Sequence, residues 1–532
     1  MNRLLYAIAR RPLALSFTRP AMQVFMMAFV WLAFLAWMRP LALPDEGRYV
    51  GVAWEMLRSG NWVTPTLDGL PFFHKPPLFY WITALALDVF GPSEWAARSA
   101  SILAGSVTVT VVHVVMRDWL GSRSAGIAAL VLATQPLFFG GAQFANLDML
   151  VAACISVAVL LGATAALRLI DAKPYRSALA GAYGAAALGV LAKGLIGLVI
   201  PALVLTVWLG LTGHRRTILR LCWFPGIAMF LVMTAPWFVA AQLEHPEFLH
   251  YFFVVQQFQR FTGTGFNNVE PFWFYVPVLL ILALPWSIWL LPILLRWRPV
   301  SPPRSAALSL MWTWLAVVLV FFSIPQSKLV GYVLPALPPV AVLVAIVASP
   351  MLPASQAARR LWWVSVGLAA CVCVAGVIGV TLTHPKSSRG LATQLASHRA
   401  AHERVAFIDE YAYDLPFYLR DNAPVVIVSN WDPAEIQHHD NWRKELADAG
   451  SFAPASAADR LIDDARFRSA LCAGHITWVV ANVEQVRQYP YLAAARLVAT
   501  DESQALWHAE VSDARFKAAL QCDSLMPQPP IK

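Results

Sequence analysis

Charged residues are scarce in this chain. Only 13% of its 532 residues are Asp, Glu, Lys or Arg, whereas soluble domains carry about 25%. Hydrophobic residues make up 58%, and the mean hydropathy is +0.57. A content this low in charge excludes an ordinary soluble protein and indicates a polytopic α-helical membrane protein.

Cysteine is also rare, and no cysteines have the spacing of a zinc finger. Four of the six fall in apolar stretches, and only Cys472 and Cys522 fall in a polar C-terminal tail. These two would form a disulfide in an oxidising compartment if their distance allowed it. The tail also lacks a Gly-rich phosphate loop, so we expect it to act as a scaffold or lid without chemistry of its own.

Long apolar runs are abundant, and eleven approach the ~20 residues that cross a bilayer. They cover 21–38, 99–116, 124–140, 149–167, 178–192, 195–211, 221–241, 272–295, 306–324, 330–348 and 361–382. Further spans fit within 76–90, 243–259 or the long 178–211 run, so we expect about eleven to thirteen. Within 178–211, the AKG at 192–194 predicts a break between two helices.

The positive charges alternate from loop to loop. With a cytoplasmic N-terminus, the inner loops hold 17 basic residues and two acids, whereas the outer segments up to residue 360 hold eight and ten. This positive-inside bias accounts for the net charge of +9, so nucleic-acid binding gains no support. An odd number of spans then places both the loop 39–98 and the tail on the outer face.

The composition becomes that of a soluble domain from about residue 384. The runs RVAFIDE, APVVIVSN and ITWVVAN are rich in apolar and β-branched residues, and charged, helix-like stretches separate them. This alternation predicts a small α/β domain. We therefore divide the chain into a membrane domain, 1–383, and a soluble α/β domain, 384–532.

The outer loop 39–98 is much longer than a connection between helices requires, and long ordered loops often carry function. Its segment DEGRYVGVAWEMLRSG predicts a helix in the membrane interface, with charges toward water and aromatic residues toward acyl chains. The next motif, FFHKPPLFYW, sets Lys75 among prolines and aromatic rings. This arrangement suits a lipid phosphate, although an aromatic belt with a snorkelling lysine would give the same pattern.

Polar residues also interrupt other apolar runs. Asp148 stands at the outer end of one run, and acids at the membrane edge are costly enough to indicate function. Lys193 stands in the break at 192–194, where a snorkelling role and a functional role are both open. Arg260 falls in a second long outer loop, 242–271.

A further cation, Lys328, and Tyr332 fall at another outer helix end. Several cations and two acids at one membrane face would suit the transfer of a group from a phosphorylated lipid. The cations would stabilise the leaving phosphate, and the carboxylates would orient the acceptor or the sugar.

At these residues the chain resembles the glycosyltransferase-C superfamily. The motifs are PDEGRY, PFFHKPPLFYW, NLDML, AKG, QRF and SKLVGYVLPALPP. Within the superfamily they are most similar to the bacterial aminoarabinose transferases, which modify lipid A and confer polymyxin resistance. The resemblance covers about 1–350 and implies a multispanning inner-membrane protein with a periplasmic active site.

The resemblance also implies roles for individual residues. Asp45 and Asp148 match the catalytic acids. The undecaprenyl phosphate would be held by Lys75, Arg260 and Tyr332, with Arg48 nearby. Four further residues are candidates for the same site: Glu46, His74, Lys193 and Lys328.

The chain departs from the family at two positions. It reads FHKP where the transferases commonly read FEKP, so His74 replaces an acid. It reads QQFQRF where they have EH..RF, so Gln256 or Gln257 replaces a histidine. Because a Glu and a His would suit a divalent metal, their replacement puts a metal cofactor in doubt. His74 stays open as a ligand, a general base or a hydrogen-bonding residue.

The sequence therefore predicts a glycosyltransferase that uses an undecaprenyl-phosphate-linked sugar and an envelope acceptor at the periplasmic face. The first choice is 4-amino-4-deoxy-L-arabinose and a lipid A phosphate. A protein O-mannosyltransferase and another lipopolysaccharide glycosyltransferase are alternatives. A membrane transporter would require internal repeats and a polar path at the bilayer midplane, whereas the charges here cluster at one face.

Overall fold

The computed structural model describes residues 19–259, 268–291, 302–383, 386–400, 403–421, 423–437, 441–501 and 504–522. The chain forms two compact units. The first unit comprises Met1–Arg39, His74–Ala86 and Ser93–His384. The second comprises Pro40–Phe73, Leu87–Pro92 and Pro385–Lys532. The second unit thus takes in much of the outer loop 39–98 in addition to the tail.

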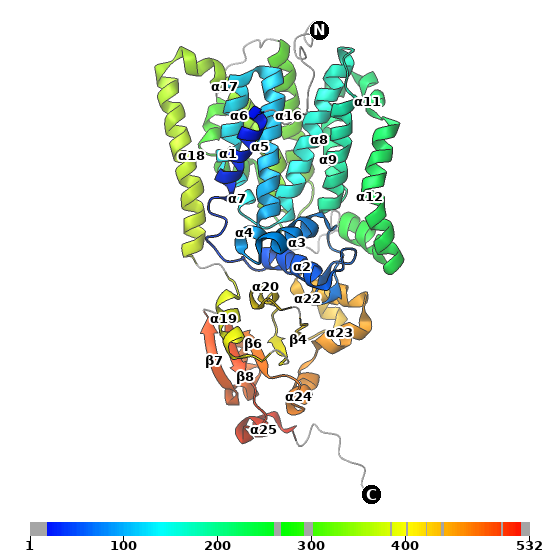
Figure 1. Cartoon of the computed structure of the whole chain (residues 1–532), viewed down its shortest axis with the longest axis vertical. Coiled ribbons are helices and arrows are strands. Elements are labelled where there is room, and N and C mark those ends of the chain that lie inside the picture. Colours follow the sequence, from blue (N-terminus) through cyan, green and yellow to red (C-terminus); the bar gives the residue numbers. More distant parts are fainter. Residues whose placement is uncertain are drawn as a thin grey trace. The chain divides into compact units, whose positions relative to one another are not determined.

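The first unit is built from helices (Figure 1). They are α1 Arg19–Ala33, α4 Glu94–Ala97, α5 Ser99–Leu120, α6 Ser122–Thr134, α7 Pro136–Ala142, α8 Leu147–Ile170, α9 Arg176–Lys193, α10 Ile196–Leu211, α11 Arg215–Leu221, α12 Phe224–Glu244, the π-helix η1 His250–Gln259, α14 Tyr275–Leu282, the 3-10 helix η2 Trp286–Leu290, α16 Pro302–Ser323, the 3-10 helix η3 Val330–Ala336, α17 Leu337–Ala354 and α18 Gln356–Leu382. Helix α3, Leu78–Phe90, begins in the first unit and ends in the second.

Among the described residues, six helices are long and apolar enough to cross a membrane. The number is seven if α6 and α7, which are bent by 65°, count as one span. The chain is therefore a multi-pass membrane protein, as predicted. The count by length is below the expected eleven to thirteen, because α1, α3 and α10 are shorter apolar helices and the run 272–295 is divided between α14 and η2.

The predicted break at 192–194 is confirmed. Helix α9 ends at Lys193, Gly194 has a φ of +100°, and α10 begins at Ile196. The two helices cross so closely that a Cβ atom on Gly197 would collide with the backbone of Gly189. Glycine therefore serves twice here, because it provides the positive φ and permits the close contact.

The second unit contains a six-stranded sheet with the order β5-β4-β3-β6-β8-β7. Its strands are β3 Val405–Ile408, β4 Val426–Val428, β5 Leu461–Ile462, β6 Trp478–Asn482, β7 Arg496–Asp501 and β8 Gln504–His508. The strands β5, β4, β3 and β6 pair in parallel, whereas β8 pairs antiparallel with both β6 and β7. The three apolar runs of the tail form β3, β4 and β6, which confirms the predicted α/β domain.

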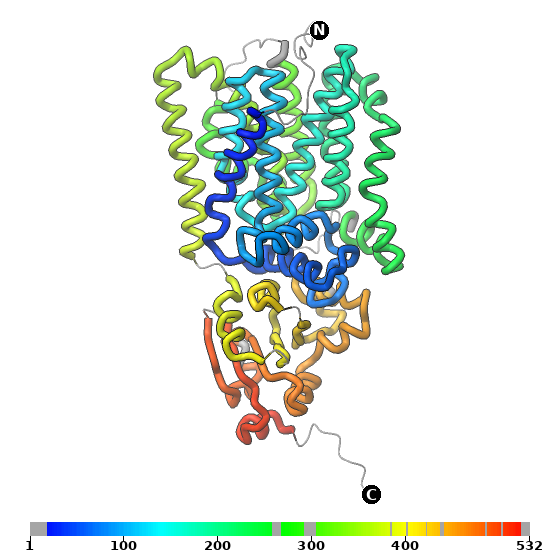
Figure 2. The backbone as a smooth tube through the Cα atoms, viewed as in Figure 1, coloured from blue at the N-terminus to red at the C-terminus, as the bar shows by residue number. Residues whose placement is uncertain are grey.

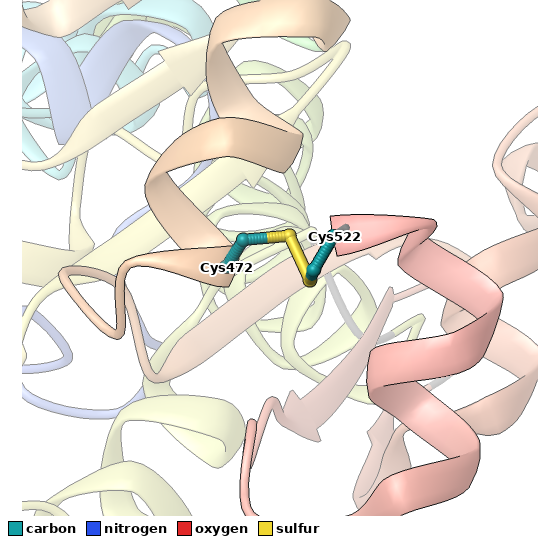
Figure 3. Close-up of a disulfide and its surroundings, with 2 residues drawn as sticks. All are labelled: Cys472 and Cys522. Atoms are coloured by element: carbon teal, nitrogen blue, oxygen red, sulfur yellow. A yellow bond between two sulfur atoms is a disulfide. The ribbon is translucent and has the colours of Figure 1, made fainter. Parts of the chain in front are cut away.

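Short helices surround this sheet. They are α19 Arg389–His398, α20 Leu415–Leu419, α21 Pro433–Gln437, α22 Trp442–Ser451, α23 Pro454–Arg460, α24 Asp464–Cys472, η4 Val483–Arg487, η5 Pro490–Ala494 and α25 Ala514–Leu520. A disulfide joins Cys472 at the end of α24 to Cys522 just after α25 (Figure 3). The pairing that the sequence left open is therefore made.

The segment 45–71 of the outer loop packs on the tail within the second unit. It forms α2, Asp45–Ser59, and a hairpin of β1, Thr66–Leu67, and β2, Leu70–Pro71. Figure 2 shows its blue trace beside the yellow and orange trace of the tail. The Trp54 ring contacts Phe417, and its Nε1–H donates to the Asp421 carbonyl at 2.8 Å.

This packing corrects one prediction. The α2 helix exists as expected, but its aromatic side chains do not face acyl chains, because Trp54 is only 4% exposed and its partners are protein. The charged residues are not uniformly turned to water either, since Glu46 and Glu55 are buried. An amphipathic pattern identifies an apolar face but not what covers it.

Two buried carboxyl groups hold the hairpin. Glu55 accepts hydrogen bonds from the Asp68 and Gly69 amides at 2.7 and 2.9 Å and from Thr66 Oγ1 at 2.7 Å. Asp68 in turn accepts from the Val425 amide at 2.9 Å. Burial raises the pKa of Glu55, and burial together with the nearby Glu55 charge raises the pKa of Asp68.

Candidate functional site

The first group of predicted site residues is centred on Asp148. The Asn146 side chain caps α8 by accepting from the Asp148 amide at 2.9 Å, so the Asp148 carboxylate lies in the first turn of that helix. It forms an ion pair with Lys193, the last residue of α9. The two side chains are only 11% and 13% exposed. The pair therefore joins the ends of two apolar helices.

Tyr332 completes this group. The Lys193 Nζ lies 4.4 Å from the centroid of the Tyr332 ring, a cation–π geometry. The neighbouring Gly331 leaves room for the Asp148 carboxylate, because a Cβ atom at that position would collide with it. The structure thus brings together Asp148, Lys193 and Tyr332, which the sequence had predicted separately on three segments.

Helix η1 lies against the same break between α9 and α10. The Gln257 amide would be 2.8 Å from a Cβ atom on Gly194. One residue earlier, Gln256 Nε2 donates to the Tyr251 hydroxyl at 2.8 Å, and the Tyr251 ring lies 6.0 Å from the His74 ring. Of the positions that depart from the family pattern, Gln257 therefore lies beside the residue after Lys193, and Gln256 and His74 both contact Tyr251. Tyr251 was not predicted, because nothing in its sequence context distinguishes it from other aromatic residues of an apolar segment.

Of the two cations expected to hold the donor phosphate, the structure describes Lys75 but not Arg260. Lys75 is half-buried in the turn before α3, and it has interacting partners. Arg260 lies outside the described residues, so its role stays a prediction. The alternative of a lipid-facing aromatic belt is wrong for Phe79 and Tyr80, because both are 0% exposed.

Lys328 has a geometry that supports a structural role. Its Nζ donates to the carbonyls of Glu270 and Gln326 at 2.7 and 3.4 Å, and its amide donates to the Asn268 carbonyl at 3.0 Å. Lys328 is 3% exposed. These contacts tie the chain before α14 to the chain before η3.

The second group of predicted site residues lies in the second unit. The Arg48 guanidinium forms ion pairs with Asp45, at 2.5 Å, and with Glu445. The Tyr413 hydroxyl donates to the same Glu445 carboxylate at 2.8 Å. Burial lowers the pKa of Arg48, but Glu445 and the other neighbours raise it more, so the net pKa lies above its ordinary value. Glu445 and Tyr413 were missed because they are distant in sequence.

Within this group, Asp45 and Glu46 differ sharply. The Asp45 side chain is 40% exposed. Glu46 is 0% exposed and accepts from the Ala42 amide at 2.9 Å. This contact supports a structural role for Glu46.

Metal ligands are not clustered in the part of the chain that the structure describes. No group of three His, Cys, Asp or Glu residues there has a geometry that could hold a metal ion. At the departing positions, Gln256 donates a hydrogen bond to Tyr251, and the His74 ring lies near the same Tyr251 ring. The roles of all the predicted site residues remain proposals.

Comparison with known proteins agrees with this architecture. A family model described as dolichyl-phosphate-mannose-protein mannosyltransferase matches residues 74–239. The undecaprenyl phosphate-alpha-4-amino-4-deoxy-L-arabinose arabinosyl transferase of Aeromonas salmonicida is 33% identical over 360 residues, which cover 65% of this chain and 63% of that protein. The protein of the same name from Erwinia tasmaniensis is 34% identical over 58% of this chain and 55% of its own length. These matches span less than two thirds of the relatives.

Solved structures extend the comparison to almost the whole chain. ArnT from Cupriavidus metallidurans bound to undecaprenyl phosphate is 25% identical with a TM-score of 0.75, and the match covers 92% of this chain and 98% of that one. The Archaeoglobus fulgidus oligosaccharyltransferase AglB shares the fold alone, with 14% identity, a TM-score of 0.50, and coverage of 90% and 71%. The chain is a glycosyltransferase-C-type membrane protein. Within that class it is similar to the ArnT aminoarabinose transferases.

Proposed function

We propose that the protein transfers a sugar from an undecaprenyl-phosphate-linked donor to an acceptor of the bacterial cell envelope. The observation that carries this proposal is the convergence of Asp148, Lys193 and Tyr332 at the ends of apolar helices. Charged groups at the ends of apolar helices would lie near the membrane edge, where the phosphate of a lipid carrier would also lie. The likeness to a structure bound to undecaprenyl phosphate supports the same donor.

The reaction needs charge stabilisation more than covalent chemistry. The acceptor oxygen forms a bond to the anomeric carbon of the sugar while the bond from that carbon to the carrier phosphate breaks. The electron pair of the broken bond stays on the phosphate oxygen, so the departing undecaprenyl phosphate gains one negative charge. In this scheme Lys75, Arg260 and Tyr332 hold the phosphate, and fixed positive charges are worth most in such a partly dry setting. Asp148 pairs with Lys193 and holds it beside Tyr332.

Asp45 is proposed to act on the acceptor or the sugar. The Asp45–Arg48–Glu445 chain of ion pairs fixes its side chain while leaving it partly exposed. A lipid A phosphate is already an oxyanion near pH 7, because its second pKa is about 6, so it needs positioning. A hydroxyl acceptor needs a general base instead.

The specific form of the proposal is 4-amino-4-deoxy-L-arabinose as the sugar and a lipid A phosphate as the acceptor. The names of the relatives support the sugar. A carboxylate at Asp45 or Asp148 would also pair with the ammonium group of an amino sugar. Protein O-mannosyl transfer is the second candidate, and the match to the mannosyltransferase family model over 74–239 favours it.

Mass spectrometry of lipid A and of periplasmic proteins, from cells with and without the chain, tests these candidates. Loss of a pentosamine from lipid A supports the first candidate, and loss of a hexose from peptides supports the second. Reconstitution with defined polyprenyl-phosphate sugars, with and without a chelator, identifies the donor and any metal requirement. The proposal fails if no polyprenyl-phosphate sugar is consumed.

We also propose that the reaction occurs at the periplasmic face of the inner membrane. The positive-inside bias supports this orientation. The Cys472–Cys522 disulfide supports it independently, because disulfides persist in oxidising compartments.

A further inference from the structure

An apolar groove of about 170 Å³, open on one side, lies among α8, α9, α10 and α11. This volume is smaller than that of a pocket that encloses a whole ligand, about 300–1,000 Å³, so the groove would hold only part of a long ligand. The groove exists because the facing residues are small: Ala158 and Gly162 on α8, and Ala182 and Ala186 on α9. Its other walls are mainly aliphatic, so its interior suits a hydrocarbon chain.

The groove is separate from the candidate active site. Asp148 lies in the first turn of α8, whereas Gly162 lies about 20 Å further along that helix at a rise of about 1.5 Å per residue. On α9 the order is reversed, since the lining residues precede Lys193, which ends the helix. The groove therefore lies toward the opposite ends of these helices from Asp148 and Lys193.

Helix α11 forms one edge of the groove and carries the adjacent charge. Its residues Ile218 and Leu221 line the groove. The same short helix exposes Arg215, Arg216 and Arg220, and within the described part of the chain none of the three forms an ion pair with a carboxylate. Leu219 is 76% exposed. An exposed leucine among arginines is typical of a segment at a membrane surface.

The edge of the groove at α11 is also structurally fixed. The Tyr183 hydroxyl, on the groove wall, donates to the Leu221 carbonyl at 3.0 Å and accepts from the Trp223 amide at 3.4 Å. The start of α12 approaches so closely that a Cβ atom on Gly226 would collide with the Tyr183 ring. These contacts hold the arginine-bearing helix beside the hollow, so the groove and the charges form one site.

We propose that this site binds an anionic glycerophospholipid. Part of one acyl chain lies in the groove, and the phosphate contacts Arg215, Arg216 and Arg220. Basic clusters beside a hydrophobic pocket between transmembrane helices bind anionic headgroups in this way. Three uncompensated positive charges select a headgroup with a net negative charge over a zwitterionic one. The isoprenoid carrier is a different occupant, because its proposed phosphate ligands lie elsewhere.

Native mass spectrometry of the full-length protein in a neutral detergent tests the headgroup. Phosphatidylglycerol and phosphatidylcholine with the same acyl chains are added separately, and we expect retained adducts of phosphatidylglycerol only. The double variant Arg215→Gln/Arg216→Gln should weaken this binding by about fivefold per arginine. The matched control Arg359→Gln/Arg360→Gln removes two exposed arginines from α18 and should leave the affinity unchanged.

A second pair of variants tests the acyl groove. Ala202 is exposed and lines the groove, so Ala202→Trp fills its mouth without disturbing the packed core. Leu203→Trp adds the same ring at the next position, which is 38% exposed and does not line the groove. We expect Ala202→Trp to abolish retention of phosphatidylglycerol and Leu203→Trp to preserve it.

Three results would overturn the proposal. The first is equal retention of the two phospholipids by the wild-type protein. The second is wild-type affinity in either the double arginine variant or Ala202→Trp. The third is displacement of phosphatidylglycerol by an equal concentration of polyprenyl phosphate, with binding of the polyprenyl phosphate blocked by Ala202→Trp, because the groove would then belong to the isoprenoid.

Discussion

The Asp148–Lys193 ion pair places two opposite charges at the ends of apolar helices, where each would be costly alone. Breaking a buried pair by removing one partner leaves the other charge uncompensated, at a cost on the order of 3 kcal/mol. The pair therefore has a structural contribution as well as its proposed chemical role. The two contributions separate when both partners are neutralised together.

We expect Asp148→Asn and Lys193→Gln each to reduce sugar transfer at least a hundredfold and to lower the melting temperature. The double variant should regain most of the melting temperature but none of the activity, because no isolated charge is left while Tyr332 has lost its cation. Thermal unfolding and turnover measured on the same preparations check this. An active double variant would show that the pair serves the fold alone.

Asp45 offers a test of the acceptor. If it deprotonates or orients a hydroxyl, Asp45→Asn should abolish transfer to a hydroxyl acceptor and leave some transfer to a phosphate acceptor, which is already ionised. Initial rates with both acceptor types give the comparison. Glu445→Gln is the matched control, because it removes the other carboxylate partner of Arg48 and leaves Asp45 in place. Equal and complete loss of both activities in Asp45→Asn would contradict a role as base.

Among single residues, the sequence predicts a functional role best where a polar residue interrupts or ends an apolar run. Asp148, Lys193 and Tyr332 were predicted because they interrupt apolar runs or end them. Glu445 could not be predicted, since its partner Arg48 lies 397 residues away and an acid in a soluble stretch is ordinary. Tyr251 likewise resembles any aromatic residue of an apolar loop.

Among the elements, α2 shows what a pattern leaves open. Its period predicted a helix with one apolar face, and the helix is present. The tail, not lipid, covers that face. The sequence did not predict this partner, because the covering residues lie more than 350 positions further along the chain. The β1–β2 hairpin was not expected, since each strand has only two residues.

The fit of α2 can be tested at Gly51. A Cβ atom there would lie 2.8 Å from the Tyr413 carbonyl oxygen, which belongs to backbone and cannot rotate away. Gly51→Ala should therefore destabilise the second unit by about 1–3 kcal/mol, despite the better helix propensity of alanine. Chemical denaturation gives the free energy of unfolding. The control Gly126→Ala has no atom within 4 Å of the new methyl and should be neutral or stabilising.

At the scale of the whole molecule, the free energy of unfolding depends on pH through buried carboxyl groups. Asp414 is 0% exposed, and burial raises its pKa to about 6 although Ser387 and Ser388 donate to it. A carboxyl group with a raised pKa holds its proton more tightly in the folded chain than in the unfolded one. Its contribution to stability is therefore present at low pH and lost as pH rises from about 4 to about 6.

Asp414→Asn should cancel this loss. Relative to the wild type, the free energy of unfolding of the variant should increase across that window by up to roughly 3 kcal/mol and stay constant above it. Denaturation at several pH values between 4 and 7 measures the difference, in which the other titrating groups cancel. The exposed Asp459 provides the control substitution Asp459→Asn. A difference that is independent of pH would show that Asp414 has an ordinary affinity for protons.

The orientation of the whole chain is tested by the Cys472–Cys522 disulfide, which closes a loop across a separation of 50 residues. Because both cysteines are buried, labelling is done on denatured protein. If the tail is periplasmic, Cys472 and Cys522 from wild-type cells should resist maleimide, whereas the free Cys222 and Cys371 react. In cells that lack the periplasmic oxidation machinery, both should become labelled.

Without the disulfide, the free energy of unfolding should fall by roughly 4 kcal/mol in the chain-entropy description. The double variant Cys472→Ser/Cys522→Ser should show the same fall in either strain, which separates the loss of the bond from other effects of the strain. Free thiols at both positions in wild-type cells would place the tail in the reducing cytosol, and the proposed periplasmic reaction would then fail with it.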